Sequence, residues 1–209
     1  GALDAGPPYI GPRPRIVSRA GWGADESLRE REFAYTGPLK AAFVHHSDSG
    51  NNYTCSQAPS VIRAIYQYHV KSRGWRDIGY NFLVDKCGTI YEGRAGGVTK
   101  AVKGAHTYGF NSNSMGVAAL GSYNKVKPSS ATVNSIAKLT AWKLGLFGVN
   151  PKAKVTMVSG GGKFPKGTKV KLNTISGHRN TYNTDCPGDQ LYSRLGATRT
   201  SAHKLQGRS

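Results

Sequence analysis

The segment Met115–Leu120 has no polar side chain, and it constrains the fold more than any other part of the sequence. A strand with one face in water alternates apolar and polar residues, whereas a run that is apolar throughout is typical of a strand covered on both faces. A second short apolar run, Ala41–Val44, ends in His45 and His46 and is predicted to be another buried strand. The chain must therefore supply helices that cover a central sheet.

Apolar residues recur at helical spacing in two longer segments. The first begins near Ser56, which can cap the helix, has Pro59 in its first turn and should end by Gly74. The second spans Ala131–Phe147 and is followed by Gly148, a typical helix stop. Both segments are predicted to be helices packed on the sheet.

The remaining elements are shorter: a hairpin, a further strand and a closing helix. They are predicted at Tyr80–Asp85 with Thr89–Glu92, at Val170–Ser176, and around Leu191 and Leu195. Strands and helices thus interleave along the chain. This order predicts the α/β class, with a mixed central β-sheet flanked by helices.

The length of 209 residues fits one large domain. Residues 1–15 contain Pro-rich stretches and are predicted to be an extended N-terminal arm, residues 16–200 the folded domain, and residues 201–209 a polar C-terminal tail. No apolar run approaches the ~18 residues that a membrane span requires, so no span is expected.

Lys and Arg outnumber Asp and Glu by 29 to 11, which gives a formal net charge of +18. A charge of this size predicts a polyanionic partner. Nucleic acid, an acidic membrane surface and an anionic cell wall all fit, and composition does not choose among them. The hydrophobic content of 38% excludes a wholly disordered chain.

Side chains at strand ends are candidates for a metal site at one edge of the sheet. His45 and His46 close a predicted strand, His178 follows another, and Cys186 comes eight residues later in a loop that contains Pro and Gly. The strand ends of α/β sheets open onto ligand-binding crevices. Two His and one Cys can bind zinc and leave the fourth tetrahedral position for water, which is typical of a catalytic site. The alternative is that each His is an ordinary hydrogen-bonded polar residue.

The other two cysteines leave two interpretations open. Cys55 begins the first predicted helix and Cys87 lies in the hairpin turn, in separate elements that can pack together. A disulfide between them would require an oxidising compartment and would leave Cys186 free for a metal. Otherwise both are buried thiols.

Seven segments match one protein family in their order along the chain. They are Ile16–Ala24, Val44–Ser47, Arg73–Phe82, Ile90–Arg94, Gly104–Thr107, Ser176–Arg179 and Cys186–Gly188. In these residues the sequence resembles the peptidoglycan recognition proteins, which belong to the type 2 N-acetylmuramoyl-L-alanine amidases. The similarity runs from about Ile16 to Leu195, and the secreted actinobacterial members are the most similar.

The resemblance implies a set of site residues. One Zn2+ ion is held by His45, His178 and Cys186, the same three residues that the strand ends suggest. The residue after Gly in the Ile-Gly-Tyr segment is catalytic, and a hydrogen-bonding residue precedes the Cys ligand by two positions. These two are Tyr80 and Thr184, and the positions that line the glycopeptide groove are His69 and His106.

The implied function is zinc-dependent hydrolysis of the amide bond between N-acetylmuramic acid and L-alanine in peptidoglycan. Such an enzyme is secreted, so the resemblance favours a Cys55–Cys87 disulfide, and its partners are peptidoglycan and anionic wall polymers. A monomer is expected. Some family members without the Cys ligand bind peptidoglycan and do not hydrolyse it, whereas this chain keeps Cys186. A nucleic-acid binder is the third class, but the chain has no recognisable nucleic-acid motif, so no specific nucleic acid is expected.

Two features depart from the family pattern. Intracellular relatives carry an acidic general base on a central strand, but Ser114–Ala119 has none, so Tyr80 is expected to take a larger part, with Glu92 as the alternative. The Gly- and Lys-rich segment Ser159–Val170 has no role in the family. It is either a loop that contacts the wall or a solvent-exposed excursion.

Overall fold

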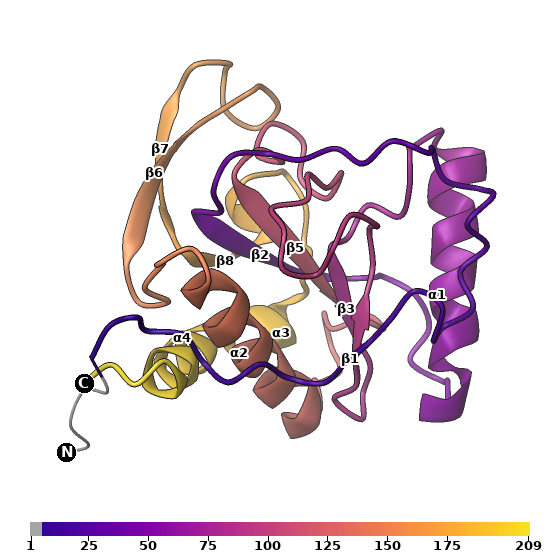
Figure 1. Cartoon of the computed structure of the whole chain (residues 1–209), viewed down its shortest axis with the longest axis horizontal. Coiled ribbons are helices and arrows are strands. Elements are labelled where there is room, and N and C mark those ends of the chain that lie inside the picture. Colours follow the sequence, from indigo (N-terminus) through magenta and orange to yellow (C-terminus); the bar gives the residue numbers. More distant parts are fainter. Residues whose placement is uncertain (1–5) are drawn as a thin grey trace.

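Six strands form a mixed central sheet in the computed structural model, which describes residues 6–209 (Figure 1). The strand order is β1-β4-β3-β5-β2-β8. The strands are β1 (Ile16–Val17), β2 (Ala41–His46), β3 (Phe82–Val84), β4 (Ile90–Glu92), β5 (Ser114–Ala119) and β8 (Ile175–Gly177). Helices flank this sheet, so the predicted fold class is confirmed.

The two apolar runs form neighbouring strands near the middle of the sheet. β2 is parallel to β5 over six residue pairs and parallel to β8 on its other side. Every residue of β2 and β5 is buried, because other segments of the chain cover both faces of the sheet. The hairpin prediction is also confirmed, since β3 pairs antiparallel with β4.

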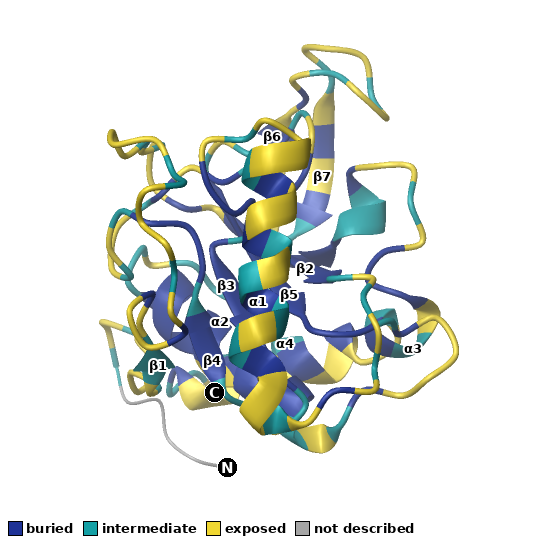
Figure 2. Ribbon diagram, turned by 90° about the vertical axis from the view of Figure 1, so that its right-hand side faces the viewer, coloured by how far each residue is buried: buried dark blue, intermediate teal, exposed yellow. Residues whose placement is uncertain are grey.

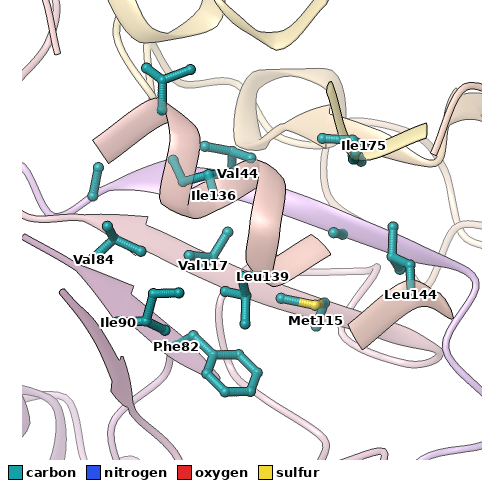
Figure 3. Packing of buried hydrophobic residues seen from close by; sticks show 14 of the residues in the cluster. Val44, Phe82, Val84, Ile90, Met115, Val117, Ile136, Leu139, Leu144 and Ile175 are labelled. Carbon is teal, nitrogen blue, oxygen red and sulfur yellow. The ribbon is translucent and has the colours of Figure 1, made fainter. Parts of the chain in front are cut away.

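Helix α2 (Ser130–Gly145) covers one face of the sheet (Figure 3). Its N-terminus is capped by Ser129, whose hydroxyl accepts a hydrogen bond from the Thr132 N–H at 3.1 Å. Ile136 and Leu139 of α2 pack on Val44 and Val117 of the central strands. Their burial removes apolar surface from water and makes this the larger core of the domain.

Helix α1 (Ala58–Gln67) covers the opposite face, and Figure 2 shows its outer side exposed. It continues a 3-10 turn (Cys55–Gln57) and runs on into a π-helical turn (Tyr68–Ser72). Ser56 therefore lies inside the helical region and does not cap it, which corrects the predicted helix start. The 3-10 turn carries a disulfide from Cys55 to Cys87 with a Cα separation of 6.2 Å, and the structure thus confirms this pairing.

A two-stranded antiparallel ribbon, β6 (Lys154–Val158) with β7 (Lys169–Asn173), stands beside the central sheet in Figure 1. Strand β6 was not predicted, and the prediction of one strand over Val170–Ser176 is wrong. The segment divides at Thr174, whose N–H donates to the carbonyl of Ala153 and whose own carbonyl accepts from Ala42. These contacts turn the chain from the ribbon into β8.

The C-terminal region forms α3 (Asp189–Tyr192) and α4 (Leu195–Leu205). The predicted closing helix is therefore two helices. The prediction of a polar tail from residue 201 is wrong for its first part, because Ala202 and Gln206 are buried and the Gln206 side chain donates to the carbonyl of Ala141. Residues 6–15 of the predicted arm contain no helix or strand, and residues 1–5 lie outside the described part. None of the helices in the described residues is long and apolar enough to cross a membrane.

A buried lysine in α2 gives the fold a specific pH dependence. Lys143 is 3% exposed, and its ammonium group donates to the carbonyls of Val98 and Lys100. Burial lowers the pKa of Lys143 from 10.5 to about 7. Between these two pH values the unfolded chain binds a proton at this position that the folded chain does not.

We expect the stability advantage of the wild type over Lys143→Met to rise between pH 7 and pH 10. Because the pKa of Lys143 is lower in the folded chain than in the unfolded chain, burial of this side chain costs the most unfolding free energy at and below neutral pH. This cost disappears as the pH approaches 10.5. The difference in unfolding free energy should grow by up to about 1.4 kcal/mol per pH unit. Urea unfolding of both proteins at three pH values measures this difference. A difference that does not change with pH would contradict the lowered pKa of Lys143.

Candidate metal centre

His45, His178 and Cys186 come together from three elements at the carboxyl ends of the parallel strands. His45 lies near the end of β2, His178 directly follows β8, and Cys186 lies in the loop before α3. One potential ligand atom from each lies within 4.8 Å of the others. The sequence prediction of these three as neighbours agrees with this geometry.

Strand alternation separates His45 from His46. Successive side chains of a strand point to opposite faces, so these two neighbours cannot both reach one site. The His46 ring instead accepts a hydrogen bond at Nδ1 from the Tyr123 N–H at 3.1 Å. His46 thus holds the chain after β5, and its backbone N–H points at Cys186 Sγ at 3.3 Å.

The Cys186 loop is held by close backbone contacts. The peptide bond between Cys186 and Pro187 is cis. The next residue, Gly188, has φ of 89°, and a Cβ atom there would lie 2.2 Å from the backbone of Tyr123, so only glycine fits. The Cys186 carbonyl accepts from the Arg179 N–H at 2.9 Å, which ties the loop to the turn that carries His178.

Thr184 supports the same loop. Its hydroxyl oxygen accepts a hydrogen bond from the Cys186 N–H at 3.2 Å. This bond leaves the hydroxyl proton of Thr184 available to another acceptor, since an OH group can donate and accept at once. The predicted part of Thr184 in the reaction stays a prediction.

His106 lies directly behind His45. His45 Nε2 is 3.1 Å from His106 Nδ1, and His106 Nε2 is 3.4 Å from the Ser114 hydroxyl. The Ser114 hydroxyl donates to the carbonyl of Phe110 at 2.6 Å. If His45 binds a metal through Nδ1, its Nε2–H donates to His106. Every proton in this row of hydrogen bonds then has one acceptor.

The substrate contact predicted for His106 stays a prediction, but both of its ring nitrogens have protein partners. Two glycines make room for this arrangement. A Cβ at Gly116 of β5 would lie 2.4 Å from the His106 ring, and one at Gly79 would lie 2.5 Å from the carbonyl oxygen of Ala105. The absence of a side chain at position 116 is therefore explained by the ring that packs there.

His69 lies on the π-helical turn and is 7% exposed. Its Nδ1 accepts a hydrogen bond from the Gly79 N–H at 2.9 Å, and its ring packs on Trp75 and Tyr80. His69 therefore fixes the backbone that carries Tyr80. Its predicted contact with substrate stays a prediction.

The Tyr80 ring packs against two imidazoles, with centroid distances of 5.3 Å to His45 and 5.6 Å to His69. Among residues 6–209, no group forms a hydrogen bond with the Tyr80 hydroxyl. Burial raises the pKa of Tyr80, and the nearby Asp48 carboxylate raises it further, so the phenol is neutral at neutral pH. The Tyr80 hydroxyl therefore carries a proton that it can donate to a bound group.

Burial also controls the charge of the candidate ligands. It lowers the pKa of His45 well below its usual value and lowers the pKa of His178 to about 4, so both rings are neutral and can offer a lone pair. Burial raises the pKa of the Cys186 thiol to about 12. The pKa of His106 is lowered to about 3 by burial, which agrees with its place as a neutral hydrogen-bond partner.

The donor set fits a tetrahedral metal of the size of zinc. With Zn–S of about 2.3 Å and Zn–N of about 2.0 Å, tetrahedral ligands stand roughly 3.6 Å apart. The observed distance from Cys186 Sγ to His45 Nδ1 is 3.8 Å. Sulfur and neutral imidazole nitrogen are the ligands that zinc prefers, and three protein ligands leave one position open.

Sequence reasoning missed Asp48, two residues beyond the end of β2. Its carboxylate is 3.7 Å from His46 Nε2, and its charge raises the pKa of both Tyr80 and Cys186. The alternative base Glu92 is engaged elsewhere, because its carboxylate accepts from the Arg19 N–H at 3.2 Å. Asp48 lies two residues after His46, so its position next to the strand end was the available signal.

Comparison with known proteins identifies the family. A family model described as N-acetylmuramoyl-L-alanine amidase matches residues 35–189, which include all three candidate ligands. The chain belongs to this amidase family. Within the matched range lie also Tyr80 and Thr184.

Curated relatives of this chain include both recognition proteins and an amidase. Peptidoglycan-recognition protein SC2 of Drosophila simulans is 34% identical over 182 residues, which cover 86% of this chain and 84% of that protein. The human N-acetylmuramoyl-L-alanine amidase is 32% identical over 189 residues, which cover 87% of this chain but only 28% of the human protein. The family thus joins proteins named for recognition and proteins named for hydrolysis.

Solved structures confirm that this chain has the fold of the recognition proteins. Wild-type Drosophila PGRP-LB superimposes with a TM-score of 0.68 at 26% identity and covers 88% of this chain and 93% of its own. A Tyr-to-Phe mutant of the same fly protein, in complex with tracheal cytotoxin, superimposes with a TM-score of 0.68 at 25% identity and covers 88% of this chain and 94% of its own.

Proposed function

We propose that this protein is a zinc-dependent amidase that cleaves the bond between N-acetylmuramic acid and L-alanine in peptidoglycan. The observation that carries the proposal is the complete His45, His178 and Cys186 set at one strand edge, with one tetrahedral position left open. Family membership supports the reaction, and the resemblance to secreted actinobacterial members supports a place outside the cell.

The reaction requires help at two points, because an amide carbonyl is a poor electrophile and an amine a poor leaving group. When bound, zinc supplies a Lewis acid that polarises the carbonyl and activates water. Tyr80 would donate a hydrogen bond from its neutral phenol to the oxygen on which negative charge develops. Thr184 would add a second donor, because its hydroxyl proton is not used by the bond from Cys186.

His106 would keep His45 in the tautomer that a metal requires. We expect His106→Ala to lower the affinity for Zn2+ by about 10–100-fold, because the Nε2–H of His45 loses its acceptor. His106→Asn places a carbonyl oxygen close to the position of Nδ1 and should lower the affinity much less. Competition with a chromophoric chelator measures both, and a wild-type affinity in the Ala variant would contradict this role.

The test of the proposed function combines metal analysis with mass spectrometry of digested muropeptides. We expect one zinc per chain and release of a free stem peptide beginning with L-Ala, and we expect a chelator to stop the release. A second candidate, a peptidoglycan-binding protein without hydrolysis, is favoured by the recognition proteins among the relatives. Binding of sacculi with no released peptide in the zinc-loaded protein would support that candidate.

The proposed setting is the cell wall. The disulfide supports an oxidising compartment, and the charge of +18 supports attraction to anionic wall polymers. The protein is proposed to act as a monomer on peptidoglycan, without a specific nucleic-acid partner.

A further inference from the structure

Positive charge is distributed unevenly along this chain. Residues 93–184 contain fourteen Lys and Arg and no Asp or Glu. The β6–β7 ribbon lies in the second half of this segment. The ribbon and its connecting loop carry five of these lysines, Lys154, Lys163, Lys166, Lys169 and Lys171. None of the six ion pairs in the described residues involves a ribbon lysine.

The register of the ribbon places three of the lysines on one face. Residues alternate between the faces of a strand, and Thr156 stands opposite Lys171 while Val158 stands opposite Lys169. We call the exposed residues Lys154, Thr156, Val158, Lys169 and Lys171 the lysine face. Figure 2 shows the alternation along β7 as stripes of exposed and buried residues.

The other face anchors the ribbon to the domain. Met157, Val170 and Leu172 are buried and pack with Phe43 of β2 and with Phe110. Burial of these side chains fixes the ribbon on the sheet and holds the lysine face in one orientation. A pre-organised surface loses less conformational freedom when it binds a partner.

The tip of the ribbon adjoins the metal centre. The Gly160 N–H donates to the carbonyl of Gly109 at 2.8 Å, and the Lys163 ammonium donates to the carbonyl of Arg179 at 2.9 Å. Arg179 directly follows the candidate ligand His178. The lysine face therefore belongs to an element that borders the site of hydrolysis.

We propose that the lysine face binds a linear phosphodiester polymer of the cell wall and holds the enzyme beside its substrate. The choice of polymer rests on the proposed function, which puts the protein at the wall. The face has no aromatic or Arg side chain on which a base could stack, which disfavours a nucleic acid.

The experiment compares two variants with the same loss of charge. Lys154→Gln, Lys169→Gln and Lys171→Gln together remove the lysine face. Arg15→Gln, Lys138→Gln and Lys204→Gln together remove three exposed charges that border two neighbouring surface hollows over α2 and α4. The probe is poly(glycerol phosphate), titrated at several salt concentrations.

We expect the first variant to bind at least about 10-fold more weakly than the wild type at low salt. The slope of log affinity against log salt should fall by about 2, since each lost phosphate contact removes about 0.7 of counterion release. The second variant should bind within about 3-fold of the wild type. Equal losses in both variants, no binding by the wild type, or tighter binding of single-stranded DNA than of the polymer would each overturn the proposal.

Hydrolysis of a small soluble muropeptide separates this proposal from the proposed function. Both variants should hydrolyse it at the wild-type rate, because neither changes a residue of the metal centre. A wild type that binds the polymer through the lysine face but releases no peptide would contradict the amidase proposal alone.

Discussion

Replacement of Cys186 by Ala is expected to abolish amidase activity, with a loss of at least about 10³-fold in kcat/KM. The side chain supplies the only sulfur in the candidate ligand set. Its removal leaves two imidazoles, and the zinc content should fall from one per chain to almost none. Metal analysis and muropeptide hydrolysis of the same preparation measure both effects.

The matched control is the wild type after treatment with a chelator. It should lose activity and recover it on addition of zinc, whereas Cys186→Ala should stay inactive. Zinc should also raise the Tm of the wild-type apoprotein but not that of the variant, because only a folded site that binds the ion is stabilised by it. A Cys186→Ala protein with activity within 10-fold of the wild type would remove Cys186 from the site.

Replacement of Tyr80 by Phe should lower kcat by about 10²–10³-fold and leave the zinc content and the fold unchanged. The phenyl ring can keep its packing on His45 and His69, and no described residue loses a hydrogen bond. Only a donor that acts on substrate is removed, so kcat should fall while KM stays close to the wild-type value. Steady-state kinetics on a soluble muropeptide measure the two constants separately.

Tyr66→Phe provides the comparison for this effect. The Tyr66 hydroxyl donates to the carbonyl of Asp25 at 2.7 Å, away from the metal centre, so its loss should cost about 1 kcal/mol of stability and leave kcat unchanged. Full activity in a zinc-loaded Tyr80→Phe protein would exclude Tyr80 from the reaction.

Two neighbouring strands of the central sheet were predictable because each contains a short run that is apolar throughout. Ala41–Val44 and Met115–Leu120 correspond to β2 and β5, and burial on both faces leaves a signal that local sequence carries. The ribbon and the C-terminal helices were not predictable in the same way. The break at Thr174 depends on hydrogen bonds to Ala153 and Ala42, and contacts between distant segments leave no local pattern.

The candidate ligands were predictable from strand ends together with the family resemblance, whereas the residues behind them were not. His45 and His46 both stand at the end of the same strand, so spacing alone does not distinguish them. They differ because their side chains point to opposite faces of the sheet. The place of His106 behind His45 depends on the close approach allowed by Gly116 and Gly79. The resemblance placed His106 in the glycopeptide groove. The sequence does not show that the two ring nitrogens of His106 face His45 and Ser114.

The Cys55–Cys87 disulfide has a consequence for survival among proteases. It closes a covalent ring of chain that contains both His69 and Tyr80. Residues 71–74 of that ring are exposed and include Lys71 and Arg73, which trypsin-like proteases cleave. A single cut there would leave the two new ends joined through the disulfide, so the tyrosine and the histidine that supports it would remain attached to the domain.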